Sequence, residues 1–260
     1  MSAAAAQTDM LPYIPATGLL ARVRRRSARL LARTPITPEL QCGMVSFTFD
    51  DCPLSVAHTA LPMLEDRGWR GTVYASMGLN GTTNHLGGHM DVDDYLSASE
   101  AGHEIGDHTY SHMDGMRAGV GLMRADINRN RAAFREAGLP EATTFAYPYG
   151  EVTPELKRAL HPDFALLRGI HTPSDQTIDT SLAASQRLYS TSMDDVMTAI
   201  ERAHAHRLWL ILFTHDVRKE PSDFGCTPDE LARTVTEVAA RDMAVHTVAD
   251  ALGIARENAA

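Results

Sequence analysis

The alternation of short apolar stretches with longer amphipathic ones constrains the fold of this chain more than any other feature. From residue 44 onward, the pattern of a strand followed by a helix repeats about seven times. The predicted strands cover residues 44–49, 72–77, 104–107, 143–147, 164–167, 208–213 and 244–247. The predicted helices cover residues 56–66, 93–101, 122–136, 155–160, 193–204, 228–241 and 248–255. This order is typical of an α/β fold with a parallel sheet, either an open doubly wound sheet or a barrel.

Size and composition narrow the class of protein further. The chain has 260 residues, of which 44% are hydrophobic and 22% charged, and this composition excludes a disordered chain, a collagen-like repeat and a coiled coil. The formal net charge of −9 disfavours a nucleic-acid binder with a basic surface. Because no boundary interrupts the alternating pattern, we expect a leader over residues 1–40 and one catalytic domain over residues 41–260.

Three features bear on the compartment. Residues 1–10 contain no basic residue, and Gln7 and Asp9 interrupt the apolar stretch that a secretory signal needs. The three cysteines are too few, and odd in number, to form a disulfide framework. Since no run of about 18 apolar residues predicts a transmembrane helix either, we expect a cytoplasmic protein.

An arginine-rich segment precedes the alternating pattern. Residues 22–33 contain six arginines, and apolar side chains spaced near one helical face accompany them, with Thr17 as a candidate N-cap. Those apolar residues are Leu19, Leu20, Val23, Leu30 and Leu31. Two hypotheses follow: the helix packs on the domain through its leucines, or it makes a weak contact with an anionic surface of a membrane or partner.

Polar residues, in one case together with a proline, follow four of the predicted strands. They are Asp50 and Asp51, His108 and His112, Pro148 and Tyr149, and His215 and Asp216. Because the loops after parallel strands share one face of the sheet, these groups can converge. No glycine-rich phosphate-binding loop follows the first strand, which disfavours a nucleotide-binding fold.

The histidine pair suggests a metal site. His108 and His112 are spaced i, i+4, so on a helix both imidazoles would face one ion, although two surface histidines at this spacing are an equally simple explanation. A carboxylate beside them would complete a two-His, one-carboxylate set suited to zinc. Adjacent residues of a strand point to opposite sides, so one of Asp50 and Asp51 could bind the metal while the other takes up a proton. Alternatively, Asp51 caps the following helix.

His215 also has two interpretations. It follows six apolar residues, so it could be a hydrogen-bonded histidine of the core. Its place at a strand end, between Thr214 and Asp216, favours instead a general acid that protonates a leaving group.

The segments TFDD, HTYSH, YPYG and LFTHD, in this order, resemble those of the polysaccharide deacetylases, carbohydrate esterase family 4. The resemblance covers roughly residues 44–255 and implies a distorted, incomplete (β/α) barrel of about seven strands with one divalent metal ion, usually zinc. It also implies roles for individual residues. Asp50 would be the general base and His215 the general acid; Asp51, His108 and His112 would bind the metal; and the Tyr149 backbone N–H, next to Pro148, would stabilise the oxyanion.

The chain departs from this family at two places. Cys52 stands where the family usually has Gly after the Asp pair, either as a small buried residue or as a thiol able to bind the metal or oxidise. The family's base-orienting Arg is missing from the position of Ala146 and Tyr147. Arg168, at the end of another predicted strand, is our candidate to replace it, provided that it lies close to Asp50.

The resemblance predicts a metal-dependent enzyme that deacetylates an N-acetylated, or alternatively O-acetylated, sugar or oligosaccharide. Two alternatives use the same residues: an amidase acting on a non-sugar C–N bond, and a carbohydrate-binding relative without catalysis. The sequence specifies neither the sugar nor the oligomeric state.

Overall fold

The computed structural model describes residues 18–173 and 176–259. The candidate helix cap Thr17 and residues 1–10, which lack the features of a secretory signal, lie outside the described residues.

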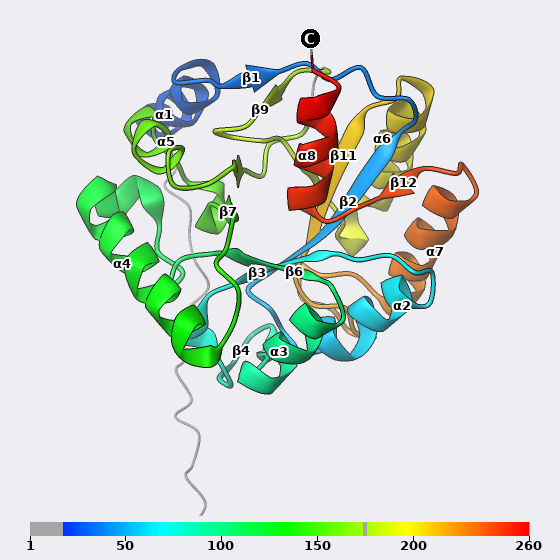
Figure 1. The fold of residues 1–260 in the computed structure, drawn as a ribbon, viewed down its shortest axis with the longest axis horizontal. Coiled ribbons are helices and arrows are strands. Elements are labelled where there is room, and N and C mark those ends of the chain that lie inside the picture. Colours follow the sequence, from blue (N-terminus) through cyan, green and yellow to red (C-terminus); the bar gives the residue numbers. More distant parts are fainter. Residues whose placement is uncertain (1–17, 174–175, 260) are drawn as a thin grey trace, which may run out of the picture.

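A curled parallel sheet forms the centre of the molecule (Figure 1). Its strands are, in spatial order, β10 (Gln186–Arg187), β11 (Trp209–Thr214), β2 (Met44–Asp50), β3 (Thr72–Ala75), β6 (Glu104–Asp107), β7 (Thr144–Ala146) and β8 (Leu166–Arg168). β12 (Ala244–Val245) pairs with the start of β2, and every pairing is parallel. The expected α/β fold, an incomplete barrel of about seven strands, is therefore confirmed.

The gap between β8 and β10 is bridged by an irregular segment rather than by a full strand. Gly169 N–H donates to the carbonyl of Ala183, and Ala183 N–H donates to that of Leu167. Ser185 N–H then donates to the carbonyl of His171, shortly before β10 begins. These few bonds hold the two edges of the curled sheet together where regular pairing stops.

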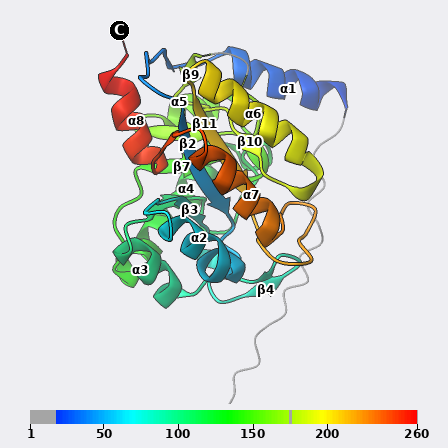
Figure 2. The same cartoon turned by 90° about the vertical axis from the view of Figure 1, so that its right-hand side faces the viewer.

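Helices cover the outside of the sheet (Figures 1 and 2). They are α2 (Leu61–Glu65), preceded by a π-helical turn over Val56–Ala60, α3 (Val92–Glu100), α4 (Gly115–Ala137), α5 (Pro154–Leu160), α6 (Met193–Ala205), α7 (Pro228–Ala239) and α8 (Val248–Glu257). Single 3₁₀ turns occupy Met77–Leu79, Pro148–Gly150 and Ser190–Ser192. Among the described residues, no helix combines the length and the apolar character needed to cross a membrane.

The elements differ from the predictions mainly at their ends. α4 begins at Gly115, seven residues before the predicted start, because Asp114 caps an extra turn that joins the helix across Gly119, whose φ is 74°. Two small antiparallel pairs escaped prediction: β1 (Pro35–Ile36) with β9 (Ile178–Asp179), and β4 (Thr83–Asn84) with β5 (Gly87–Gly88). Strands of two residues leave no periodic pattern to detect.

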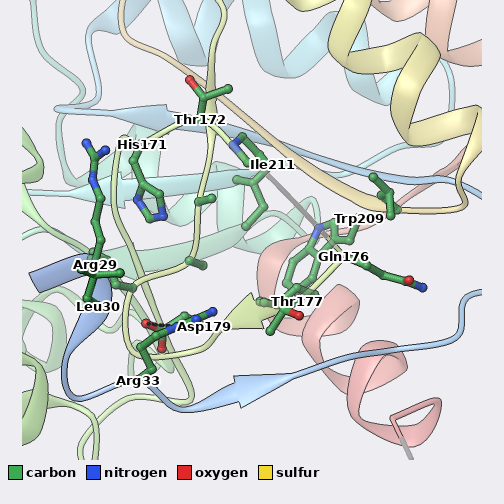
Figure 3. A pocket seen from close by; sticks show the side chains of 16 residues that line it. Arg29, Leu30, Arg33, His171, Thr172, Gln176, Thr177, Asp179, Trp209 and Ile211 are labelled. Atoms are coloured by element: carbon green, nitrogen blue, oxygen red, sulfur yellow. Dashed lines mark ion pairs between the residues drawn. The ribbon is translucent and has the colours of Figure 1, made fainter. Parts of the chain in front are cut away.

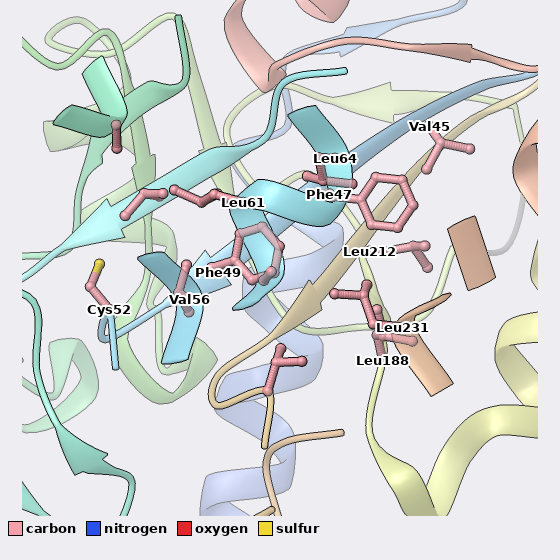
Figure 4. Packing of buried hydrophobic residues seen from close by; sticks show 14 of the residues in the cluster. Val45, Phe47, Phe49, Cys52, Val56, Leu61, Leu64, Leu188, Leu212 and Leu231 are labelled. Atoms are coloured by element: carbon pink, nitrogen blue, oxygen red, sulfur yellow. The ribbon is translucent and has the colours of Figure 1, made fainter. Parts of the chain in front are cut away.

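The core lies between β2 and the helices that cover it (Figure 4). All seven residues of β2 are buried, which explains its continuous apolar run. Phe47 and Phe49 belong to one buried cluster with Leu61 and Leu64 of α2. This packing fixes the end of β2, and with it Asp50, inside the barrel.

The arginine-rich segment forms α1 (Leu19–Leu30), but it does not pack through its leucines. Ala21 and Ala28 are the buried residues of the helix, whereas its large apolar side chains are more than half exposed. Beneath the helix, Lys157 Nζ donates to the carbonyls of Ala28 and Leu31, each at 2.9 Å. The hypothesis that the leucines anchor the helix is therefore wrong, because α1 lies so close to α5 that small residues form the contact.

Candidate active site

A cavity of about 440 Å³ opens at the carboxyl ends of the strands. Polar side chains reach this cavity from the ends of four strands, which are β2, β6, β7 and β11. Six of the residues singled out in the sequence line this cavity: Asp50, Asp51, His108, His112, Tyr149 and His215. The residues at the ends of these strands therefore converge on one cavity, as expected.

Asp51, His108 and His112 form a compact group of candidate metal ligands. One ligand atom from each lies within 4.8 Å of the other two, and all three residues are buried. Asp51 Oδ1 is 3.0 Å from His112 Nε2 and 3.5 Å from His108 Nε2, and it lacks a hydrogen bond among the described residues. A buried carboxylate oxygen facing two imidazole nitrogens fits one divalent cation that keeps an open position for water.

The two histidines do not lie on a helix, contrary to the geometry that their spacing suggested. They belong to the loop after β6, where Thr109 and His112 have φ angles of 62° and 53°. These left-handed residues fold the loop tightly, and Thr109 Oγ1 accepts a hydrogen bond from Met113 N–H. The turn, rather than a helical face, brings the two imidazole centroids to 4.9 Å from each other.

The surroundings of His108 and Asp51 determine the charge of each side chain. Burial and then the nearby His112 lower the pKa of His108 to about 4, so its imidazole is neutral at physiological pH. Burial alone would raise the pKa of Asp51, but His112, His215 and His108 hold it well below its ordinary value. His108 Nδ1 lies 2.8 Å from the carbonyl of Ala146, which as hydrogen-bond acceptor directs Nε2 towards Asp51. The neutral imidazole of His108 and the ionised carboxylate of Asp51 are the forms in which these side chains bind a metal ion.

Asp50 faces a different partner from Asp51. Asp50 is the last residue of β2, while Asp51 has a φ of 59°, so the strict alternation of a strand stops between them. Both line the same cavity, but Asp50 accepts hydrogen bonds from Arg168 Nη2 at 2.5 Å to each carboxylate oxygen. Asp50 is therefore paired with Arg168, whereas Asp51 faces the two histidines.

Arg168 is fully buried at the end of β8. Its guanidinium carbon lies 5.1 Å from the ring centroid of Tyr74 and 5.0 Å from that of Phe213, which is within the range of a cation–π contact. In the register of β7 and β8, Arg168 is the partner of Ala146. It therefore projects from the strand next to the position at which the family places its arginine.

His215 presents one ring nitrogen to the cavity. Its Nδ1 lies 3.1 Å from the carbonyl of Phe224, to which it can donate, and its Nε2 is 3.9 Å from Asp51 Oδ2. The side chain is 15% exposed, so it sits at the wall of the cavity rather than in the core. The ring is thus held by one nitrogen and faces the candidate metal site with the other.

Tyr149 lies in the 3₁₀ turn after β7 with a φ of 58°. Its ring meets that of His112 edge-on, with 4.3 Å between the centroids. Pro148, buried before it, starts the turn. The turn therefore holds the backbone of Tyr149 directly beside a candidate metal ligand.

Cys52 is separate from the ligand group. Its thiol donates to the carbonyl of Tyr74 at 3.0 Å, and burial raises the pKa of the thiol well above its ordinary value. A buried, protonated thiol is a poor metal ligand and a poor nucleophile. The structure places Cys52 in the apolar cluster of the core.

The sequence did not reveal the aromatic wall of the cavity. Tyr189 and Phe224 line it together with His85, and the ring centroid of Phe224 lies 5.8 Å from that of His215. All three come from loops, where no periodicity marks a residue for burial or function. Flat aromatic faces at the mouth of a polar site suit the apolar face of a sugar ring.

A second cavity, of about 380 Å³, lies near the start of β11 and beside α1 (Figure 3). Arg29, Arg33, His171 and Asp179 contribute its charged or titratable side chains. Arg33 Nε is 3.9 Å from Asp179, which Lys157 also engages at 2.8 Å. Among the described residues that line this cavity, Asp179 is the one carboxylate and it is already paired, so they do not form the ligand set found at the opposite ends of the strands.

Comparisons with known proteins match this chain to polysaccharide deacetylases. Residues 37–162 match the family model of polysaccharide deacetylase. A chitin deacetylase of Colletotrichum lindemuthianum is 33% identical over 103 residues, which are 38% of this chain and 40% of that protein. A bifunctional xylanase/xylan deacetylase of Cellvibrio japonicus is 29% identical over 118 residues, 45% of this chain and 16% of that protein. The chain thus spans well under two thirds of both curated relatives.

The fold is shared with solved structures over most of the chain. A crystal structure from Mycobacterium smegmatis, of a protein assigned to the polysaccharide deacetylases, superposes with a TM-score of 0.66. The two chains are 17% identical, and the match covers 86% of this chain and 95% of the other. At this identity the comparison establishes the distorted barrel.

Proposed function

The chain belongs to the polysaccharide deacetylase family, and from this premise we propose that it is a metal-dependent hydrolase that deacetylates an N-acetylated sugar or glycan. An O-acetylated sugar is the second candidate substrate. The observation that carries the proposal is the Asp50–Arg168 pair next to the group of Asp51, His108 and His112. The named activities of the two curated relatives, on chitin and xylan, agree with an acetylated glycan as substrate.

Asp51, His108 and His112 would hold the divalent ion, for which zinc is our first choice because two neutral imidazoles and a carboxylate are typical zinc ligands. When bound, such an ion polarises a carbonyl group and makes water more acidic. The hydrogen bond between His108 Nδ1 and the Ala146 carbonyl keeps that ligand in position before any ion arrives.

Asp50 is the proposed general base. Its carboxylate lines the cavity beside Asp51, and Arg168 fixes the orientation of both of its oxygens. It would take the proton of the water that attacks the acetyl carbon. A positioned base of this kind typically accelerates a reaction about 10²- to 10⁴-fold.

His215 is the proposed general acid. With Nδ1 held by the Phe224 carbonyl, Nε2 is the nitrogen that would deliver a proton to the departing sugar amine. Amines are poor leaving groups unless they are protonated, so this step is needed for C–N cleavage. The Tyr149 backbone N–H is the proposed donor to the oxyanion, a contribution typically worth about 3 kcal/mol.

The test is an acetate-release assay on the zinc-loaded chain with N-acetylglucosamine oligomers, acetylated xylan and small N-acetyl amides. We expect release from at least one acetylated sugar, loss of activity with a chelator, and recovery when zinc is added. In a parallel hydrolysis assay, turnover of a cyclic imide or ureide, without acetate release from any sugar, would assign the site to an amidase. Zinc binding without acetate release from any of these compounds would support a carbohydrate-binding relative and contradict the proposal.

A further inference from the structure

The outer face of α1 exposes large apolar side chains, which surface helices normally turn towards the core. Five of the exposed large apolar side chains of the described residues belong to this one segment: Leu19 at 78%, Leu20 at 66%, Val23 at 54%, Leu30 at 61% and Leu31 at 51% exposed. A soluble protein normally buries such residues, and a group of them on one element marks an interaction site. No described residue covers them.

The helix is fixed with this face outward. At 3.6 residues per turn, Leu19, Val23 and Leu30 lie within about 40° of one another around the helix axis, opposite the buried Ala21 and Ala28. The inward side is locked by Lys157, which binds the carbonyls of Ala28 and Leu31. Figure 2 shows α1 lying along the outer surface of the molecule.

A second clamp ties α1 to the catalytic cavity. The Arg25 guanidinium pairs with the carboxylate of Glu151, which is buried. Glu151 directly follows the turn of Pro148–Gly150 that carries Tyr149. Because of this clamp, α1 is held as a rigid platform on the body and not as a loose extension.

Arginines flank the apolar stripe. Arg22, Arg26 and Arg29 lie along one side of it, all exposed, and none makes an ion pair with a described residue. Residues 1–33 hold six of the 24 basic residues and one of the 33 acidic residues, so the remainder of the chain carries −14. A partner of negative charge would therefore attract α1 and repel the rest of the molecule, which orients the contact.

We propose that α1 is an interfacial helix that docks this protein on an anionic lipid bilayer. Leu19, Val23 and Leu30 enter the boundary between headgroups and acyl chains, and the flanking arginines bind lipid phosphates. A second copy of the chain is a poorer occupant, because two α1 helices would bring their arginines together. The proposal does not depend on the proposed enzymatic activity.

The test is flotation of the full chain with vesicles of phosphatidylcholine alone and of phosphatidylcholine mixed with phosphatidylglycerol. We expect binding to the mixed vesicles at least about 10-fold tighter than to the neutral ones, and weakening at high salt. Arg22→Gln/Arg26→Gln should lower affinity about 30-fold, at about 1 kcal/mol per arginine. Leu19→Ser/Leu30→Ser should lower it at least about 10-fold.

Two controls match these variants in chemistry and exposure. Lys219→Gln/Arg233→Gln removes two exposed charges outside α1, and Leu122→Ser removes a leucine of α4 that is 62% exposed. Both should bind like the wild type, and circular dichroism should show all variants folded. Equal binding to both kinds of vesicle, or equal losses in the control variants, would overturn the proposal. So would a dimer in sedimentation velocity that Leu19→Ser/Leu30→Ser dissolves while no vesicles are bound.

Discussion

Arg168 Nη2 lies 2.5 Å from both carboxylate oxygens of Asp50, although the two residues are 118 positions apart in the chain. Both side chains are buried, so water contributes little to their solvation. The barrel makes this contact because β2 and β8 both end at the face of the sheet that holds the cavity, and we propose that Arg168 takes the place of the arginine that the family carries on the neighbouring strand.

Replacing Arg168 should damage both catalysis and stability. Arg168→Met leaves the buried Asp50 charge without its partner, and we expect a loss of about 3–5 kcal/mol in the free energy of unfolding. We expect kcat/KM to fall about 100-fold or more, since a mobile base is poorly aligned. Arg168→Lys should lose less stability but still lose activity, because one ammonium cannot repeat the fork of a guanidinium. Urea unfolding and initial rates measure the two effects.

The register of β7 and β8 supplies the control for that experiment. Because Ala146 is the partner of Arg168, Ala146→Arg in an Arg168→Ala background places the guanidinium on the neighbouring strand at the same level. We expect part of the lost activity to return. If the double variant folds and binds metal but is no better than Arg168→Ala, the role of Arg168 in orienting Asp50 is wrong.

The alternation of short apolar runs with amphipathic stretches predicted an α/β fold with a parallel sheet, and the resemblance of four segments to the polysaccharide deacetylases favoured the incomplete barrel over an open sheet. His108 and His112 lie together as their i, i+4 spacing suggested, but for a different geometric reason, since a turn with left-handed residues, not a helix, joins them. The sequence allowed the leucines of α1 either to pack on the domain or to face an anionic surface, and they are exposed because alanines form the close contact of this helix with the body. Loop aromatics such as Phe224 carry no pattern that sequence can reveal.

Asp107 should make the stability of the metal-free protein depend on pH. Burial raises the pKa of its carboxyl from 3.8 to about 7. Between these values the unfolded chain holds fewer protons than the folded one, so the stability that Asp107 contributes is lost as pH rises from about 4 to 7. Asp107→Asn has no such proton to lose, so its stability relative to the wild type should increase across this window. Unfolding curves at several pH values, with chelator present, measure the difference, and parallel profiles would refute it.

The three thiols should differ in reactivity. Cys42 is exposed, whereas Cys52 and Cys226 are buried, and burial raises the pKa of Cys226 to about 12. A thiol reagent should therefore modify one cysteine per folded chain at neutral pH and three after unfolding. Cys52→Ala should bind the same amount of metal as the wild type. Fast modification of Cys52 in the folded protein would show an accessible, reactive thiol and contradict this prediction. Loss of the metal ion in Cys52→Ala would make Cys52 a ligand.

We propose that metal binding and proton transfer belong to two neighbouring carboxylates, Asp51 and Asp50. Metal content and acetate release, measured together on Asp50→Asn, Asp51→Asn and the wild type, test it most directly. We predict that Asp50→Asn keeps one metal ion per chain and loses about 10³-fold in kcat, while Asp51→Asn loses the ion. An Asp50→Asn variant with near wild-type turnover, or an Asp51→Asn variant that retains full metal occupancy, would contradict the account.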